Sequence, residues 1–180
     1  MSNPMFKFED AQRMQCKASI MIEGLPGKGK TGLALLIGYY LSGQDWKKVF
    51  HIDTENKSAN LFVDIPASDG QKFGHFKVGQ LTSDIGFKPT NFIAFREAAI
   101  AAGAEVVIKD SISHAWQYKG GVLDILNDAK AKDSRYAKDS YAAWGDPEVV
   151  KEKNELLNLI RDHRAHVITT VRVKEKMEYV

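Results

Sequence analysis

The sequence predicts an α/β fold in which a mostly parallel sheet carries helices on both faces. Three observations support this prediction. Short apolar runs that suit buried strands alternate along the chain with longer segments of helical apolar spacing. A glycine-rich stretch, residues 24–31, joins the first of these strands to the first of these helices. Polar residues follow several of the strands, at the edge where parallel sheets bind their ligands.

The elements are predicted from local signals along the chain. Strand 18–22 precedes the glycine-rich stretch, and a helix follows it as far as Leu41. Thr90 and Asp146 suit the N-caps of two later helices, and Pro147 suits a first helical turn. The remaining predicted elements are strands 48–52, 75–78, 105–108 and 166–171, helices 90–102 and 146–164, and a short helix within the less regular segment 120–144.

Composition describes an ordinary globular protein with one core. The chain has 180 residues, of which 44% are hydrophobic and 27% are charged. Its net charge of +2 does not by itself require a nucleic-acid partner. The one cysteine, Cys16, excludes an internal disulfide and is expected to be buried, as in a reducing cytoplasm. No apolar run approaches the roughly 18 residues of a membrane span, and the N-terminus lacks a secretory signal, so no membrane association is expected.

Residues 24–31 fit the phosphate-loop pattern G-x-x-x-x-G-K-[ST] between a strand and a helix. Glycines allow backbone N–H groups to point at an anion, and the helix N-terminus adds partial positive charge. Lys30 is expected to reach the outer phosphates, and the Thr31 hydroxyl to ligate Mg²⁺. This context predicts a P-loop NTPase whose nucleotide-binding residues are Gly24, Leu25, Pro26, Gly27, Lys28, Gly29, Lys30, Thr31 and Gly32.

Two acidic positions complete the predicted chemistry. Asp110 follows a buried strand and is the candidate second ligand for magnesium. The strand that leads to such an aspartate is usually apolar throughout, and Lys109 departs from this pattern. Hydrolysis also needs a carboxylate that positions water. Glu55 is the candidate, with Asp53 as an alternative, because strand alternation gives both residues the same facing.

In order and spacing, the phosphate loop and the segments 52–55, 107–111 and 167–172 resemble the RecA-like ATPase core. More narrowly, the chain resembles the bacteriophage RecA-like nucleotide-binding ATPases, which are short recombination ATPases that work beside single-strand annealing proteins. The segments that carry this narrower resemblance are 110–116, 120–124, 143–146 and 172–174.

The resemblance implies a RecA-like ATPase domain over residues 17–180, behind a lead segment of residues 1–16. Sheets of this class often continue beyond the equivalent point, which leaves open that terminal strands of the core lie outside this sequence. ATP is the implied nucleotide, with Mg²⁺, and Lys30 and Glu55 are the implied catalytic residues. The γ-phosphate sensor maps to Thr170, where the family often has glutamine, or to Arg172, Lys174 or Lys176 in the same or a neighbouring subunit.

The resemblance also implies single-stranded DNA as a partner, together with an annealing or single-strand-binding protein. It further implies a homo-oligomer and the cytoplasm of a bacterial host. Cations and aromatics in segment 130–144 suit a DNA loop, but interleaved aspartates make a solvated loop equally consistent with composition. With the resemblance in favour of DNA, the expected DNA-binding residues are Lys130, Lys132, Arg135, Tyr136 and Lys138.

Two other functions fit the same phosphate loop. A small nucleoside or nucleotide kinase is compatible with the size of the chain, but segment 130–138 holds only one arginine for a closing lid. A nucleotide switch that binds without hydrolysing stays open because Lys109 and Thr170 both depart from the expected residues.

Overall fold

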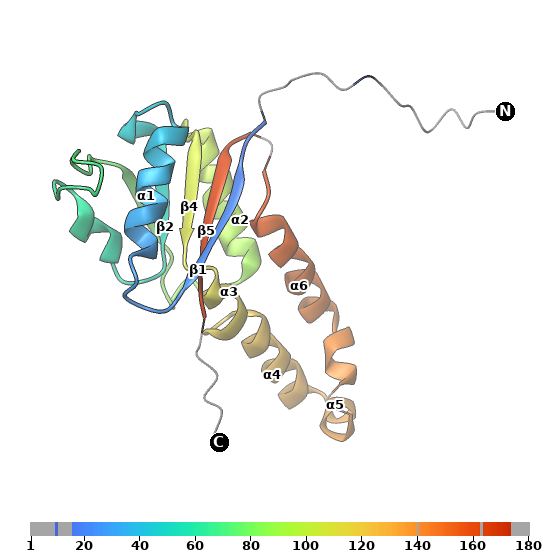
Figure 1. The fold of residues 1–180 in the computed structure, drawn as a ribbon. Helices are drawn as coiled ribbons and strands as arrows, with labels where there is room; N and C mark the ends of the chain where they lie inside the picture. Colours follow the sequence, from blue (N-terminus) through green and yellow to red (C-terminus); the bar gives the residue numbers. More distant parts are fainter. Residues whose placement is uncertain (1–9, 11–15, 140, 163, 174–180) are drawn as a thin grey trace.

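The computed structural model describes residue 10 and residues 16–139, 141–162 and 164–173. Within them, a five-stranded and all-parallel sheet has the order β1-β5-β4-β2-β3 (Figure 1). Strand β5, the last described strand, therefore lies between the phosphate-loop strand and the strand that leads to Asp110. The strands are β1 (Ser19–Gly24), β2 (Val49–Asp53), β3 (Lys77–Gln80), β4 (Val106–Asp110) and β5 (His166–Arg172).

Helices cover both faces of the sheet, which confirms the predicted fold class (Figure 1). The α1 face buries Leu35 and Ile108, whereas the opposite face buries Phe92 and Val107. Successive residues of β4 thus belong to different cores, as the alternation of side chains along a strand requires. The main covering helices are α1 (Lys30–Leu41), α2 (Pro89–Ala101) and α6 (Pro147–Leu159), and two short 3-10 helices, η1 (Trp46–Lys48) and η2 (Ser58–Phe62), flank β2.

A helical lobe extends away from the carboxyl edge of the sheet (Figure 1). It has its own small core, in which Ile125, Leu126 and Val149 are buried. Its elements are α3 (Ser113–Gln117), α4 (Val122–Lys132), α5 (Ser134–Lys138) and η3 (Ala142–Gly145). The sequence predicts only one short helix here, because the segment mixes charged and small residues without a sustained helical period.

Helix α6 is attached to α2 through buried and half-buried polar contacts. Glu152 is 2% exposed, and its carboxylate accepts hydrogen bonds from the backbone N–H and the hydroxyl of Thr90, at 3.1 and 2.9 Å. Nearer the start of α6, Lys88 Nζ lies 2.6 Å from Glu148 Oε1. Asp146 caps α6 by accepting the N–H of Glu148.

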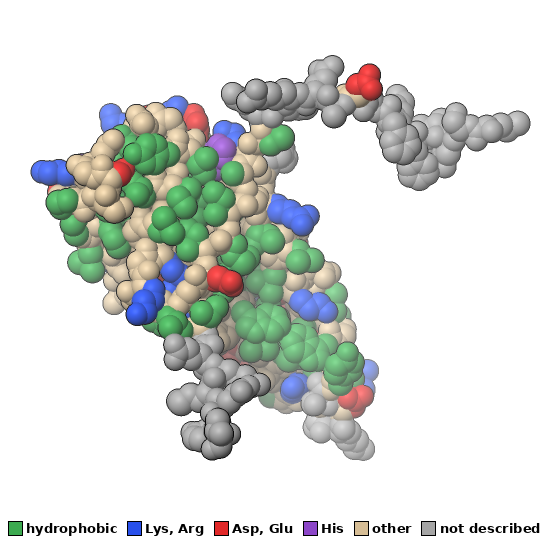
Figure 2. Space-filling model, in the orientation of Figure 1, with side chains coloured by type: hydrophobic (Ala, Val, Ile, Leu, Met, Phe, Trp, Pro, Cys, Tyr) green, Lys and Arg blue, Asp and Glu red, His purple; other side chains and the backbone are tan. Residues whose placement is uncertain are grey.

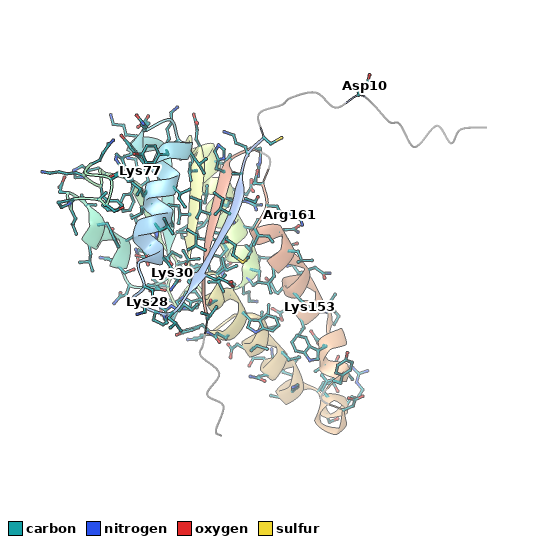
Figure 3. The ribbon with its side chains drawn as sticks, viewed as in Figure 1. Asp10, Lys28, Lys30, Lys77, Lys153 and Arg161 are labelled. Carbon is teal, nitrogen blue, oxygen red and sulfur yellow. The ribbon has the colours of Figure 1, made fainter. Side chains whose placement is uncertain are left out.

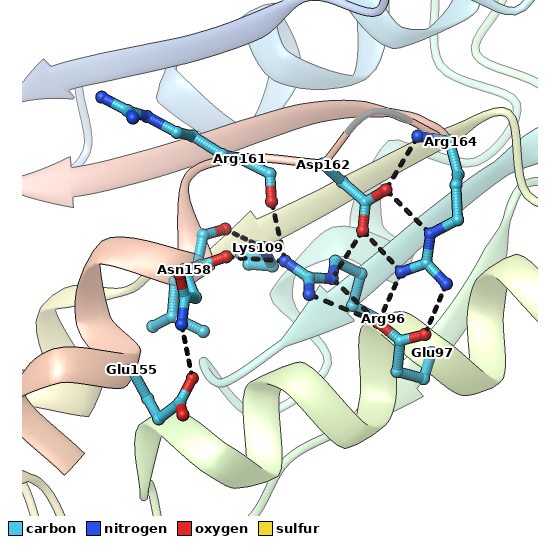
Figure 4. A network of polar contacts seen from close by, with 9 residues as sticks. Arg96, Glu97, Lys109, Glu155, Asn158, Arg161, Asp162 and Arg164 are labelled. Carbon is cyan, nitrogen blue, oxygen red and sulfur yellow. Dashed lines mark hydrogen bonds and ion pairs between the residues drawn. The ribbon is translucent and has the colours of Figure 1, made fainter. Parts of the chain in front are cut away.

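Two buried cations hold the carboxyl end of α6 (Figure 4). The Arg96 guanidinium donates to the carbonyl oxygens of Asn158 and Arg161, at 2.6 and 2.9 Å, and pairs with Asp162 at 3.2 Å. The Lys109 ammonium donates to the carbonyl of Leu159. The carbonyls of Asn158 and Leu159 lie in the last turn of α6, where helical acceptors lack intrahelical partners, and that of Arg161 lies just beyond it. The cations thus satisfy acceptors that burial would otherwise leave unpaired.

The Lys109 side chain is fully buried on the α2 and α6 face, away from α1. Burial lowers the pKa of its ammonium to about 7, and the nearby charge of Arg96 acts in the same direction. Asp162 and Glu97 oppose these effects without cancelling them. The unexpected lysine of β4 is thus an anchor for α6.

Four predictions of a boundary, a cap or burial are wrong. Thr90 is not an N-cap, because α2 begins at Pro89 behind Lys88 and the Thr90 hydroxyl donates to Glu152 instead. Helix α6 ends at Leu159 instead of residue 164, because the buried cations take the carbonyls of Asn158 and Leu159. Strand β3 covers Lys77–Gln80 instead of residues 75–78, because it pairs with β2 up to the level of Asp53. Cys16 is exposed instead of buried. No helix within the described part of the chain is long and apolar enough to cross a membrane.

Replacing Lys109 by methionine should change how stability depends on pH. The pKa of Lys109 is lower in the folded protein than in the unfolded chain, so between about pH 7 and 10 the unfolded chain binds more protons. The unfolding free energy of the unmodified protein should therefore rise with pH, relative to that of Lys109→Met, by up to about 1.4 kcal/mol per pH unit.

Urea unfolding at several pH values between 7 and 10 measures this difference. The exposed Lys151 provides the matched control, since Lys151→Met should leave the slope unchanged. Parallel pH profiles for the unmodified protein and Lys109→Met would contradict the prediction.

Candidate nucleotide site

The glycine-rich stretch forms the loop between β1 and α1, at the carboxyl edge of the sheet (Figure 3). Gly27 and Gly29 have φ angles of +74° and +79°, in the left-handed region that favours glycine. Gly29 is the N-cap of α1 and carries no side chain there, so the first N–H groups of the helix are open to an anion. The predicted nucleotide-binding residues, 24–32, therefore lie in one continuous loop and helix start.

Lys30 is folded back over this loop. Its ammonium donates hydrogen bonds to the carbonyl oxygens of Gly24 and Leu25, at 2.9 and 2.8 Å. Figure 3 shows Lys28 and Lys30 together at this end of α1. The loop thus has one ammonium held against it and a second, on Lys28, that is exposed.

Asp110 is the centre of the site. Its carboxylate accepts hydrogen bonds from the Thr31 hydroxyl, at 2.5 Å, and from the Thr170 hydroxyl. His51 Nε2 lies 3.6 Å from the same carboxylate, beyond good hydrogen-bond distance. Burial alone would raise the pKa of Asp110, but His51 and the two hydroxyls outweigh burial and hold it at about 2. Asp110 is therefore an anion at neutral pH, although it is 1% exposed.

The backbone around Asp110 is fixed by Thr54. The Thr54 hydroxyl donates to the Asp110 carbonyl at 2.9 Å and accepts the N–H of Ser111 at 2.8 Å. The Thr54 N–H also donates to the Asp110 carbonyl, and the peptide bond between Asp110 and Ser111 is cis. The ends of β2 and β4 are thereby joined directly beside the carboxylate.

Asp53 and Glu55 have different surroundings, contrary to the predicted common facing. Asp53 is fully buried, and its carboxylate accepts the N–H groups of Glu55 and Ala59, at 2.5 and 3.5 Å. Strand β2 ends at Asp53, so the alternation on which that prediction depended stops before Glu55. Asp53 holds the turn through backbone N–H groups, whereas the half-buried Glu55 makes no such contact with the turn and its carboxylate meets a side chain of β5.

Arg172, at the end of β5, is paired with Glu55. Its Nη2 and Nε lie 2.5 and 2.8 Å from Glu55 Oε1, and this pairing raises the pKa of the guanidinium. The Arg172 N–H donates to the Ser113 hydroxyl at 2.9 Å, which fixes the backbone. Of the four residues expected to sense the γ-phosphate, Thr170 and Arg172 thus lie at this edge, and Lys174 and Lys176 lie outside the described residues.

Three polar residues of the site are not among the predicted site residues. His51 lies beside Asp110, and both of its ring nitrogens are buried without a hydrogen-bond partner among the described residues. His114 is buried against Phe87 and Tyr118, and burial lowers its pKa. Gln80 ends β3 next to Asp53. A polar residue inside an apolar strand is the one local signal that could have pointed to His51.

The expected DNA-binding residues lie at the far end of the helical lobe, on α4 and α5 (Figure 1). Arg135 is exposed but pairs with Asp133 at 2.5 Å. Tyr136 packs against the core of the lobe. Lys130 and Lys132 are in the last turn of α4, and the side chain of Lys138 lies outside what the structure describes.

The parallel sheet has a glycine loop at its edge, the next helix begins with a lysine and a threonine, and an ionised aspartate lies beside them. These features define a P-loop nucleotide-binding ATPase. The comparisons with known proteins agree. The family model described as "AAA domain" matches residues 16–179, so the chain belongs to this family of P-loop ATPases. A comparison with curated proteins gives no match.

Alanine at Gly29 should damage both the loop and its binding of phosphate. The φ of +79° places a Cβ in the left-handed region, at a cost of about 1–2 kcal/mol, and relief of that strain would turn the helix N–H groups away from the anion. We expect weaker binding of a fluorescent ATP analogue and a lower free energy of unfolding. Gly145→Ala is the matched control, since that site has open space and no left-handed φ. Equal effects at the two glycines would contradict the prediction.

Proposed function

We propose that this P-loop ATPase hydrolyses ATP with Mg²⁺, is stimulated by single-stranded DNA and acts in phage-type homologous recombination or annealing. The observation that carries ATP hydrolysis is the meeting of the phosphate loop, Asp110 and Glu55 at one edge of the sheet. The recombination role is supported by the resemblance of segments 110–116, 120–124, 143–146 and 172–174 to the phage RecA-like ATPases.

The donor set beside Asp110 fits a magnesium ion. Magnesium at nucleotide sites takes oxygen ligands from one or two protein side chains and from the phosphates. The Thr31 hydroxyl and the ionised Asp110 carboxylate are in contact and would supply the protein ligands. In the described part of the chain, no group of three or more His, Cys, Asp or Glu side chains could hold a metal alone. The bound ion would neutralise charge on the phosphoryl group.

Lys30 and Glu55 each hold a partner that a bound triphosphate would replace. The Lys30 ammonium would exchange two backbone carbonyls for phosphate oxygens. Glu55 can accept a proton from the attacking water only after its carboxylate leaves Arg172. The γ-phosphate offers Arg172 another anion, so Arg172 would sense the γ-phosphate and release Glu55 in the same movement.

The proposed partners follow from the same resemblance. The protein would bind single-stranded DNA as a homo-oligomer in the bacterial cytoplasm, beside an annealing or single-strand-binding protein. A neighbouring subunit would contribute a further cation to the γ-phosphate. Light scattering with ATP and DNA present should therefore report particles larger than a monomer, and a strict monomer would count against assembly.

ATP turnover with and without single-stranded DNA tests the proposal, using Lys30→Ala and Glu55→Gln. Lys30→Ala should lose nucleotide binding together with turnover, because the phosphates lose their cation. Glu55→Gln should bind ATP with an unchanged Kd but turn it over about 10²- to 10⁴-fold more slowly, because the amide cannot accept a proton. Glu105→Gln, which alters a carboxylate at the amino end of β4, is the matched control.

Each rival function gives a different outcome in this assay. Phosphoryl transfer to a nucleoside, with no stimulation by DNA, would identify a kinase. ATP binding without turnover in the unmodified protein would identify a nucleotide switch. An ATP turnover rate that single-stranded DNA does not change would support the ATPase activity and overturn the DNA-dependent role.

A further inference from the structure

An apolar groove of about 390 Å³ lies on the α6 side of the sheet, beside the edge strand β1. Several of its side chains are well exposed: Leu157 is 70% exposed, Met21 51% and Trp116 39%. Along β1, Ile20 and Ile22 pack on the α1 side, so Met21 faces the opposite side. We call this the Trp116 groove, and it is lined by Met21, Ile112, Ser113, Trp116, Gln117, Leu156, Leu157, Ile160, Val171 and Arg172.

The indole ring of Trp116 is held in place by packing against a second tryptophan. Trp116 and Trp144 are stacked, with ring centroids 6.1 Å apart and planes 20° apart. Trp144 in turn packs against the core of the helical lobe. The groove therefore presents a large aromatic side chain whose orientation is set by the fold, and Figure 2 shows hydrophobic side chains gathered over this part of the molecule.

Cations flank the groove along α6. Lys153 is exposed and lies one turn before Leu157 on the same face of the helix. Arg161 lies just beyond the end of α6, where its side chain extends along β5 and away from the ionic network (Figures 3 and 4). Among the described residues, neither side chain has an ion-pair partner, whereas Arg135 of the lobe has one.

A second cavity lies further along β1 and the end of α6. Arg161 and Lys17 line this cavity of about 760 Å³, together with Ser19, two residues before Met21 on the same face of β1. Glu155 and Asp162 also line it, but Asp162 is neutralised by Arg96 and Arg164. Around the groove, the cations Lys17, Lys153 and Arg161 therefore stand beside two carboxylates: Glu155, which accepts the Asn158 amide, and the exposed Glu23, which follows Met21 on the same face of β1. The cations outnumber these carboxylates, so the surroundings of the groove carry net positive charge.

We propose that the Trp116 groove binds single-stranded DNA, with bases against Trp116 and phosphates along Lys153 and Arg161. This inference rests on the proposed function and places its DNA site. Stacking on aromatic rings combined with cations that follow the backbone is how proteins hold single strands without reading sequence. A duplex does not expose its base faces, so it should compete poorly for the groove.

The position of the groove also connects DNA to hydrolysis. Its far end is Arg172, whose guanidinium holds Glu55, and Ser113 of the groove accepts the Arg172 N–H. A DNA phosphate at this end would compete with Glu55 for the guanidinium. Occupation of the groove would thereby favour the state in which Glu55 is released.

The test measures the binding of a fluorescently labelled oligo(dT) to the full chain by fluorescence anisotropy. Trp116→Ala should weaken binding by roughly 5- to 150-fold, the range measured for one stacked base. Trp116→Phe should restore most of the affinity. Oligo(dT) should quench tryptophan fluorescence in the unmodified protein and less in Trp116→Ala. Of the two tryptophans left in that variant, Trp46 stacks on Tyr39 on the α1 side and Trp144 packs against the core of the lobe.

Charge-reversal variants distinguish DNA binding at the Trp116 groove from DNA binding at the helical lobe. The double variant Lys153→Glu/Arg161→Glu should weaken binding and reduce the slope of log K against log salt by about 1.4, the equivalent of two lost phosphate contacts. The matched double variant Lys132→Glu/Arg135→Glu changes the same charge on the lobe and should bind as the unmodified protein does. Circular dichroism and thermal unfolding check that every variant is folded.

The outcomes distinguish the two levels of the proposal. If the unmodified protein binds oligo(dT) and only the lobe variant loses affinity, the groove is not the DNA site, and the proposed function stands. If the unmodified protein does not bind oligo(dT) at all, both are overturned. Self-association that Trp116→Ala abolishes, without DNA binding, would identify the groove as an interface between copies of the chain.

Discussion

The structure depends on the carboxylate of Asp110 and the groups that surround it. Two threonine hydroxyls, from the first turn of α1 and from β5, donate to this carboxylate, and Thr54 of the β2 end binds its backbone. One buried anion thus connects the phosphate-loop helix with three strands of the sheet. Because its hydrogen bonds keep it ionised, the same group that organises the fold is ready to bind a cation.

Much of the fold could be predicted because its signals are local. Apolar runs predicted the strands, and caps such as Asp146 predicted the helix starts. The end of α6 could not be predicted, since it depends on Arg96 and Lys109, which are distant in sequence. The lobe was missed for a related reason: its small core is built from α4, η3 and α6 together and not from one periodic segment.

The candidate site divides in the same way. The phosphate loop is recognisable from the fixed spacing of its residues, and Asp110 from its position at the end of a strand. The pairing of Glu55 with Arg172 joins residues 117 positions apart, and no pattern in either segment indicates it. The separation of Asp53 from Glu55 depends on where β2 stops, and such boundaries are set by tertiary contacts. The aspartates interleaved in segment 130–138 indicate diluted positive charge, but its composition does not show that Asp133 pairs with Arg135 in particular.

The way in which α6 is fastened has a consequence for recognition. The helix is held near its start by Glu148, in its middle by Glu152 and at its end by the carbonyl of Leu159. Its backbone is therefore already ordered before any partner arrives. Preorganisation of this kind spares a complex the conformational entropy that a flexible segment would lose on association. A binding surface built on α6 should accordingly show a small entropic penalty and little structural change between its free and bound states.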